Sequence, residues 1–364
     1  MSAQISAPAA PTAEHGRSPV RSRRLIVPMG ALALLLALAA LHLATGTQQL
    51  GIFEVAAALL TSREVDSLHH QIVVDIRLPR TLVAATAGGM LALAGALLQS
   101  VLRNPLAAPS VLGVSSGAVL LAALAVTFGP PVGTLGPVLP LLALVGGLGA
   151  GLAVYTLGRH RGRTDPTRLI LVGVLLSGIA ASATAAVVIV GGSSVSGVLR
   201  WMIGSVNGRV WHDWHVLWPW ALVTIPLALA TARVGNLLQI GDEAAAAVGL
   251  PVERARLLLV LLAAMLTAGA VAIVGAVAFV GLIVPHAVRG LVGADTRRVF
   301  PLSLVAGAAL LLAADAVVST VRVELPGDPL SPPALLPVGV LTAFLGGAFF
   351  AVVLLRRPHQ SGVS

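Results

Sequence analysis

The segment "LLLVLLAAMLTAGAVAIVGAVAFVGLIVPHAV", residues 257–288, runs for 32 residues without a single Asp, Glu, Lys or Arg. A membrane-spanning helix needs about 20 apolar residues. The segment is therefore long for one span and short for two. Gly275 and Gly281 lie within it and would allow a tight reversal, since glycine tolerates the required backbone angles. The number of spans here decides whether the chain ends on the side of the membrane where it begins.

The rest of the chain is also too apolar for water to be its main solvent. Of its 364 residues, 57% are hydrophobic and only 10% are charged, against about 25% charged in soluble domains. The apolar runs are long and continuous, whereas a membrane β-barrel shows alternating segments of about ten residues. The composition predicts an all-α integral membrane protein, because a helix satisfies its own backbone groups in lipid.

Stretches that are almost free of charge predict the other spans. They are the run that starts at residue 25, with no charge before Glu54, and residues 81–102, 104–158 (two spans, broken by "GPPVGTLGP"), 169–199, 214–232, 299–321 and 329–355.

Arginines decide between nine and ten spans, because cytoplasmic loops are enriched in them. If residues 257–288 hold two spans, 17 of the 23 basic residues lie in the cytoplasm and 6 outside; with one span the split is 13 to 10. We therefore predict about ten transmembrane helices with both termini in the cytoplasm. Residues 1–24 are predicted to be a disordered cytoplasmic tail, residues 25–357 a single ten-helix domain, and residues 358–364 a C-terminal tail.

The residue types that are missing exclude several functions. The chain has no cysteine, and all 23 of its basic residues are arginine. A P-loop needs a lysine to contact phosphate, so any ATP that drives this protein is hydrolysed by another chain. The net charge of +9 is accounted for by cytoplasmic loops, and we expect no nucleic-acid partner.

One short segment, "GDEAAAAVGLPVERAR" (residues 241–256), carries five charges in sixteen residues. Asp242 and Glu243 suit the positive N-terminus of a helix, while Gly249 would end it and Pro251 prevent its continuation. The pattern predicts a short cytoplasmic helix at about residues 241–251. It is either a solvated connector or, because its alanines allow close approach, a docking surface for another protein.

Polar residues within the predicted spans have two possible roles. Asp315 lies deep in a span, where a charge costs roughly 2.5–3.5 kcal/mol on insertion scales, so we expect it to be paired, helix-facing or protonated. A structural hydrogen bond is favoured over a proton relay, and His286 is interpreted in the same way. Gln99 either bonds across helices or lines a pathway. Asn104 can bond its own backbone before Pro105, which makes a rigid turn or a gate.

Arg77 and Arg80 stand at the outer mouth of the second span. Both arginines could pair with carboxylates of a docking protein, since such rim charges steer association. The alternative is that they anchor lipid phosphates.

Several of these segments resemble a known family. Glu243-Ala244-Ala245 followed by Gly249 is similar to the EAA-and-glycine loop of bacterial ABC import permeases. Residues 25–357 resemble the iron-siderophore, haem and cobalamin permease family, often called FecCD. The segments that carry this resemblance are "RLPR" (77–80), "QSVLRNPLAAPSVLGVSSGA" (99–118), "VGLIVPHAVRGLVGADTRRVFPL" (280–302), "LLLAADAVV" (310–318) and "LPVGVLTAFLGGAFF" (336–350).

The resemblance implies partners and site residues. It implies a permease in the bacterial plasma (inner) membrane, paired with a second, identical or related permease chain. Cytoplasmic P-loop ATPase subunits bind below, and an extracytoplasmic substrate-binding protein docks above. The residues expected to couple to the ATPase are Asp242, Glu243, Ala244, Ala245, Gly249 and Pro251. Those expected to dock the binding protein are Arg77, Arg80 and Arg322. Those expected in the pathway or gate are Gln99, Asn104 and Pro105, and the structural polar residues are His286 and Asp315.

The implied function is ferric siderophore import by alternating access. Haem or cobalamin import is the alternative within the family. Outside the family, an ion-coupled secondary transporter would need several intramembrane ionisable groups, and an intramembrane enzyme would need paired catalytic residues. We expect no catalytic residue, cofactor or metal site in this chain.

The sequence departs from the family pattern at three positions. Leu335 stands where the family usually has a glutamate, and Ser319 where it has an arginine, with Arg322 one turn later. Ala348 replaces a proline. The first two changes fall at the predicted outer mouth, so they bear on docking geometry and substrate choice rather than on the fold.

Overall fold

The computed structural model describes residues 20–46, 48, 50–60, 68–129, 138–160, 163–191, 201–323 and 334–355. These residues are almost all helical, which confirms the all-α prediction. Apart from turns and loops, the described residues also contain two short antiparallel strand pairs. In these, β1 (Arg159–His160) pairs with β2 (Arg163–Thr164), and β3 (Arg322–Val323) pairs with β4 (Ala334–Leu335). Helices dominate because lipid offers no hydrogen bonds to an unpaired backbone.

The helices follow one another in this order: α1 (Val20–Ala44), α2 (Ile52–Leu60), α3 (Leu68–His70), the π-helical η1 (Gln71–Arg77), α4 (Leu78–Val101), the short η2 (Pro109–Leu112), α5 (Val114–Phe128), α7 (Leu139–Gly158), α8 (Pro166–Gly191), α10 (Trp211–Ala230), α11 (Ala232–Gln239), α12 (Asp242–Ala247), α13 (Val252–Val274), α14 (Val280–Val292), α15 (Thr296–Thr320) and α16 (Val338–Leu355).

Six stretches of helix are long and apolar enough to cross a membrane: Ile26–Ala44, Leu68–Val101, Leu139–Gly158, Pro166–Gly191, Val252–Val274 and Thr296–Thr320. The pair α10 and α11, bent by 46°, adds a seventh, and α5, α14 and α16 contain shorter apolar helices. These helices coincide with the predicted segments. The count of ten spans and the cytoplasmic position of both termini stay predictions.

The predicted tails need one correction. Helix α1 begins at Val20, so the last five residues of the tail predicted at 1–24 are helical. Arginine is a good helix former, and the helix extends past the apolar stretch through Arg21, Arg23 and Arg24. Residues 1–19 and the predicted C-terminal tail 358–364 lie outside the described residues.

The segment at 257–288 contains two helices joined by the predicted reversal, and it stays a prediction that both cross the membrane. Helix α13 ends at Val274, and Gly275 follows with a φ of 76° that favours glycine. Helix α14 then runs from Val280 to Val292. Gly281 has a different role from the predicted one. It lies inside α14 where that helix crosses α4, and a Cβ there would come within 2.6 Å of the Leu91 carbonyl oxygen.

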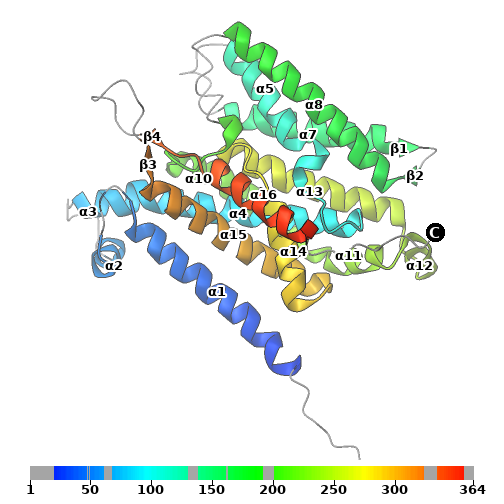
Figure 1. The fold of residues 1–364 in the computed structure, drawn as a ribbon, viewed down its shortest axis with the longest axis horizontal. Helices are drawn as coiled ribbons and strands as arrows, with labels where there is room; N and C mark the ends of the chain where they lie inside the picture. The colour runs from blue at the N-terminus through cyan, green and yellow to red at the C-terminus, as the bar shows by residue number, and fades with distance from the viewer. Residues whose placement is uncertain are drawn as a thin grey trace, which may run out of the picture.

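Helix α4 is the centre of the molecule. Nearly all of its residues from Ala87 to Val101 are buried, and Figure 1 shows it between α13 and α15. Its glycines let the backbones approach closely: Gly88 meets Gly307 of α15, and Gly95 meets Gly281 of α14. In lipid, where apolar burial does not drive helices together, such small-residue crossings favour association by close packing.

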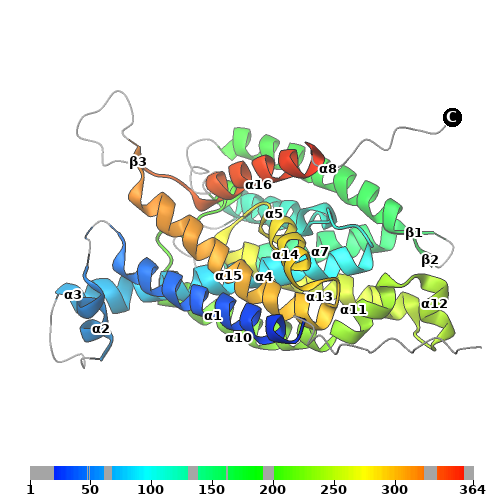
Figure 2. The ribbon, with the colours of Figure 1, turned by 60° about the horizontal axis from the view of Figure 1, so that its bottom comes forward.

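The elements outside the spans gather at opposite ends of the helix bundle. Figure 2 shows α2, α3 and β3 at one end and α12, β1 and β2 at the other. From the arginine distribution we expect the α12 end in the cytoplasm, and we call it the cytoplasmic end and the opposite one the outer end. Helices α5, α7 and α8 form a group along one side, and α1 lies on the opposite side (Figure 1).

Gly95→Ala should destabilise the protein, because the added methyl group would collide with the carbonyl group of Gly281. Overpacking of this kind costs about 1–3 kcal/mol. The measurement is the thermal unfolding temperature in detergent. Gly149→Ala is the matched control, since a Cβ at that helical glycine meets nothing within 4 Å. Equal unfolding temperatures for the two variants would contradict the importance of this crossing.

Candidate functional site

The short cytoplasmic helix predicted at about residues 241–251 is present as α12, six residues long. Gly241 precedes it with a φ of 111°, and Gly249 follows it with a φ of 85°. Both values favour glycine. Because two such turns flank it, α12 lies outside the bundle as a separate element between α11 and α13 (Figure 1).

Helix α12 has an inner and an outer side. Ala245 is fully buried, whereas Glu243, Ala244 and Gly249 are exposed. Val248, just beyond the helix, is 65% exposed. The exposed side of α12, which we call its outer side, therefore carries small apolar side chains and one carboxylate. Another protein can approach such a surface closely.

Asp242 is partly exposed and forms ion pairs within the chain. Its carboxylate accepts from Nη2 of Arg256, at 2.9 Å to Oδ1 and 3.0 Å to Oδ2. Nη2 of Arg103 lies 3.2 Å from Oδ1. Arg103 follows α4 with a φ of 49°, which is uncommon for a residue other than glycine. Asp242 thus anchors α12, unlike the exposed Glu243.

The hairpin before α8 is tied to the start of α13. Glu253 accepts hydrogen bonds from the backbone N–H of Thr164, at 3.1 Å to Oε2, and from its hydroxyl, at 2.7 Å. Nη1 of Arg256 donates to the Thr164 carbonyl oxygen at 2.8 Å and to Glu253 Oε1 at 3.3 Å. Arg256, which lies in α13, therefore connects that helix to the β1–β2 hairpin and to α12.

Beside α12 lies a groove of about 1050 Å³. It is lined by Thr164, Asp165, Pro166, Arg168, Asp242, Glu243, Ala246, Leu250, Pro251, Val252, Glu253 and Arg254. Its walls are the start of α8, helix α12 and the start of α13. The groove and the outer side of α12 form one continuous cytoplasmic surface around Glu243, and we call it the cytoplasmic surface.

Asp295 caps α15 at the same end of the molecule. Its carboxylate accepts from the backbone N–H of Arg297 and, at 2.7 Å, from the side-chain amide of Asn236 in α11. The hydrogen bond from Asn236 and the neighbouring arginines hold the pKa of Asp295 below its usual value. This ionised cap joins α11 to α15.

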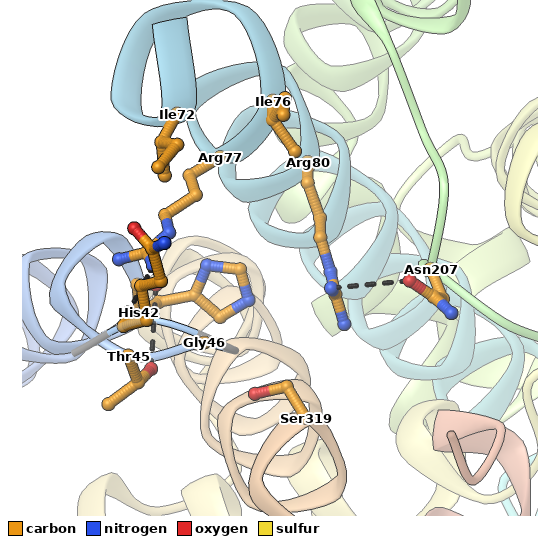
Figure 3. Close-up of a pocket in the computed structure, with 10 residues that line it drawn as sticks. His42, Thr45, Gly46, Ile72, Ile76, Arg77, Arg80, Asn207 and Ser319 are labelled. Carbon is orange, nitrogen blue, oxygen red and sulfur yellow. Dashed lines mark hydrogen bonds between the residues drawn. The ribbon is translucent and has the colours of Figure 1, made fainter. Parts of the chain in front are cut away.

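A pocket of about 300 Å³ opens at the outer end of the bundle. Figure 3 shows its lining: His42, Thr45, Gly46, Gln48, Ile72, Ile76, Arg77, Arg80, Asn207 and Ser319. These residues come from α1, η1, α4, α15 and the loop before α10. Arg77 and Arg80 enter it side by side from the start of the second span.

Asp315 binds two basic side chains behind this pocket. It is 1% exposed and lies near the outer end of α15, which ends at Thr320. Arg80 donates to both of its oxygens, Nε at 2.7 Å and Nη2 at 2.9 Å, and His42 Nε2 lies 2.8 Å away. Asp315 is paired, as expected. It lies near the outer end of α15 and not in the middle of the span.

His42 also contacts the second span. Its Nδ1 lies 2.8 Å from the hydroxyl oxygen of Thr81, and that hydroxyl donates to the carbonyl oxygen of Arg77. His42 therefore links α1 to both α15 and α4.

Arg77 was predicted to present its charge to a docking partner, but its side chain is buried and bonded within the chain. Its side chain is buried, and Nη1 donates to the carbonyl oxygens of Leu43 at 2.7 Å and Ala44 at 2.9 Å. Nη2 donates to the Gln48 carbonyl oxygen. These carbonyl groups at the end of α1 lack helical partners. Arg77 therefore ties the end of α1 to the second span.

Arg80 and Arg322 are the other predicted docking residues. Arg80 is 17% exposed, and Nη1 reaches Asn207 at 3.4 Å across the pocket (Figure 3). Arg322 lies in β3, where its backbone is paired with Leu335 of β4. The strand pair thus places Leu335, one of the positions that depart from the family pattern, beside Arg322. Glu324 and the residues that follow it up to Pro333 lie outside the described part.

The residues predicted for a pathway or gate lie inside the chain or in a turn. Gln99 is buried, and its amide nitrogen donates at 3.3 Å to the carbonyl oxygens of Ala107 and Leu282, while Arg289 donates to its side-chain oxygen. These contacts favour the cross-helix alternative for Gln99.

Asn104 Oδ1 accepts from the backbone N–H of Leu106 at 2.9 Å, around Pro105. This bond favours the rigid turn over a gate. His286 packs edge-on against Phe349 of α16, with ring centroids 5.5 Å apart.

Sequence reasoning missed four of the residues in these clusters: His42, Arg103, Thr164 and Arg256. Arg256 stands three residues after Glu253, a spacing that brings side chains together on a helix, so that one contact was foreseeable. Its bonds to Asp242 and Thr164 join segments far apart in the sequence, and no local pattern signals them.

Comparison with known proteins finds permeases that match most of the chain. The cobalamin import permease of Halobacterium salinarum is 40% identical over 290 residues, covering 80% of this chain and 75% of that protein. A permease of the Fe(3+) dicitrate transport system of Escherichia coli strain K12 is 36% identical over 327 residues, 90% of this chain and 98% of the relative. The hemin transport permease of Yersinia pestis is 36% identical over 329 residues, 87% and 93% of the two chains.

A solved structure described as an inward-facing conformation of a metal-chelate type ABC transporter superimposes with a TM-score of 0.76. Its sequence is 28% identical, and the match covers 91% of this chain and 99% of that one. The profile of the FecCD transport family matches residues 34–356. This protein therefore belongs to the FecCD transport family.

Proposed function

We propose that this chain, as the membrane-spanning permease of an ABC importer in the bacterial plasma membrane, carries ferric siderophores by alternating access. The observation that carries the proposal is α12: a helix anchored by Asp242 and Ala245 on one side and exposed through Glu243 and Ala244 on the other. A connector would need no such division between an anchored and an open side.

The cytoplasmic surface is the proposed contact for a P-loop ATPase. The small side chains of α12 let a partner backbone come close, and the groove beside it offers a depression of about 1050 Å³. This chain has no lysine for a P-loop of its own. The energy for transport therefore enters through α12 from the ATPase, and the chain itself performs no covalent chemistry.

The outer pocket is the proposed contact for an extracytoplasmic binding protein. Arg77, Arg80 and His42 line the pocket, and Asp315, held by Arg80 and His42, is the carboxylate behind them. The basic side chains of the pocket therefore outnumber this carboxylate. Arg80 is the residue of this cluster that remains partly exposed. It would meet an acidic side chain of the binding protein, with Arg77 bracing the helix ends behind it.

The relatives support a bulky metal chelate as the substrate class. Two of them are named for Fe(3+) dicitrate and hemin, and the structural relative for metal chelates. A ferric siderophore is a metal chelate of this kind. The cobalamin permease, 40% identical, keeps cobalamin as the second candidate. The substrate would pass between this chain and a second permease chain.

Ala246→Trp should prevent the ATPase from docking, because Ala246 is exposed and lines the groove. Gly249 is less suitable for this test, since its φ of 85° would add backbone strain to any substitution. The measurement is the amount of ATPase that co-purifies after gentle extraction. Leu60→Trp, at an 87% exposed position of the outer end, is the matched control. Full ATPase recovery with Ala246→Trp would rule out docking at α12.

Arg80→Gln combined with Asp315→Asn should speed dissociation of the binding protein. The double change removes both charges of the pair together, which avoids leaving a buried carboxylate unpaired. The net charge of the pocket stays the same, so the effect comes from the lost short-range pairing of Arg80 with a carboxylate of the binding protein, and we expect dissociation roughly tenfold faster. Arg209→Gln, another arginine of the outer end, is the control. Unchanged dissociation kinetics would favour the lipid-anchor role of Arg80.

Competition during uptake distinguishes the substrates. Cells that depend on this permease should accumulate iron from a ferric siderophore, and excess haem or cobalamin should not reduce that uptake. The measurement is initial uptake of labelled iron with and without each competitor. Strong inhibition by cobalamin, together with cobalamin accumulation, would replace the siderophore by the second candidate.

A further inference from the structure

We infer that Arg256 is a positioning residue that holds α12, the start of α8 and the start of α13 together as one moving unit. The inference rests on the proposed function, in which an ATPase pushes α12. It adds the route by which that push reaches the membrane spans. Arg256 touches neither the ATPase nor the substrate in this account; it acts through Asp242, Thr164 and Glu253.

Burial distinguishes Arg256 from the other arginines of the cytoplasmic end. Its side chain is 1% exposed, and it is among the largest fully buried side chains of the described residues. A buried guanidinium must be paired, because removing it from water costs several kcal/mol. Asp242, Glu253 and the Thr164 carbonyl oxygen accept from its two Nη atoms, while Nε has no hydrogen-bond partner among the described residues. The cluster therefore stays closed in order to keep this charge satisfied.

The partners of Arg256 come from three separate elements. Asp242 is the first residue of α12, Thr164 ends the β1–β2 hairpin just before α8, and Glu253 lies in the first turn of α13. Thr164 is held by Glu253 as well as by Arg256, because its backbone N–H and its hydroxyl donate to the Glu253 carboxylate. Displacing any one element from the others would break several charge-assisted hydrogen bonds, which are stronger than neutral ones.

The second link of α12, to Arg103, is weaker. Arg103 and Asp242 are 38% and 43% exposed, and their shortest contact is 3.2 Å. Exposed ion pairs of this kind contribute little and are screened by salt. The end of α4 can therefore separate from α12 more easily than α8 and α13 can. The push on α12 is passed mainly to α8 and α13.

The shape of the side chain also matters. Nη1 and Nη2 of Arg256 point to different partners, Nη1 to Thr164 and Nη2 to Asp242. A lysine ammonium carries the same charge but lacks the planar fork that spans both. Arg256→Lys should therefore keep the fold but lose some of the hydrogen bonds that join α13 to Thr164 and Asp242. Arg256→Met removes the charge and all these bonds.

The test compares transport with ATP hydrolysis in the complete complex of permease, ATPase and binding protein, reconstituted in liposomes. Wild type, Arg256→Lys, Arg256→Met and the control Arg233→Met, an exposed cytoplasmic arginine, are assayed for substrate moved per ATP hydrolysed. Couplings between protein sites typically amount to 5–150-fold. We expect this ratio to fall about tenfold for Arg256→Met, less for Arg256→Lys and not at all for the control, with the ATPase still bound in every case. An unchanged ratio for Arg256→Met would overturn the inference.

A second measurement does not depend on the folding of Arg256→Met, and the absence of cysteine from the chain makes it straightforward. Spin labels are attached at Thr167→Cys in α8 and Leu258→Cys in α13, both exposed positions that do not line the groove. In the wild-type complex the distance between the labels should be narrowly distributed and equal with and without ATP. A change on adding ATP would show that α8 and α13 separate, and would overturn the inference.

The outcomes also distinguish this inference from the proposed function. If ATP changes neither uptake nor any measured distance in the wild-type complex, the proposed ATP-driven mechanism fails. If wild-type uptake requires ATP and Arg256→Met is coupled normally, only the role of Arg256 fails.

Discussion

Every backbone N–H and C=O group inside a bilayer must find its partner within the chain, and the rest of this structure follows from that constraint. It makes the described residues almost wholly helical. Since lipid gives apolar helices little reason to associate, the helices are held by close approach at small residues. Helix α4 shows this most clearly, with Gly88 against Gly307 and Gly95 against Gly281.

The same constraint confines charge to the two ends of the bundle and makes it pair there. At the outer end Asp315 is held by Arg80 and His42; at the cytoplasmic end Arg256 is held by Asp242 and Glu253. Each cluster joins elements that are distant in sequence. Each also lies beside a surface where, in the proposed function, a partner protein binds. In each cluster one charged side chain is almost fully buried, Asp315 at the outer end and Arg256 at the cytoplasmic end. The residues that would meet a partner, Arg80 and Glu243, are partly or fully exposed.

Parts of the site could be predicted because they depend on local chemistry. The glycines around α12, the turn of Asn104 and the reversal at Gly275 each follow from backbone preferences of single residues. Arg77 was misjudged for the opposite reason. Its place at the mouth of a span suggested an exposed charge, and only the folded chain puts the free carbonyl groups of α1 within its reach.

The sequence by itself determined the membrane class, the all-helical fold and the resemblance to the FecCD family, because hydrophobic runs, arginine bias and short motifs are properties of contiguous residues. The tertiary structure alone decided which charges are buried and which partners they have. Arg256 and Arg254 are separated by one residue, yet one is buried in a cluster and the other is exposed. The difference arises because the β1–β2 hairpin and α12 lie against the face of α13 that carries Arg256, and burial depends on neighbours that the sequence does not place in space.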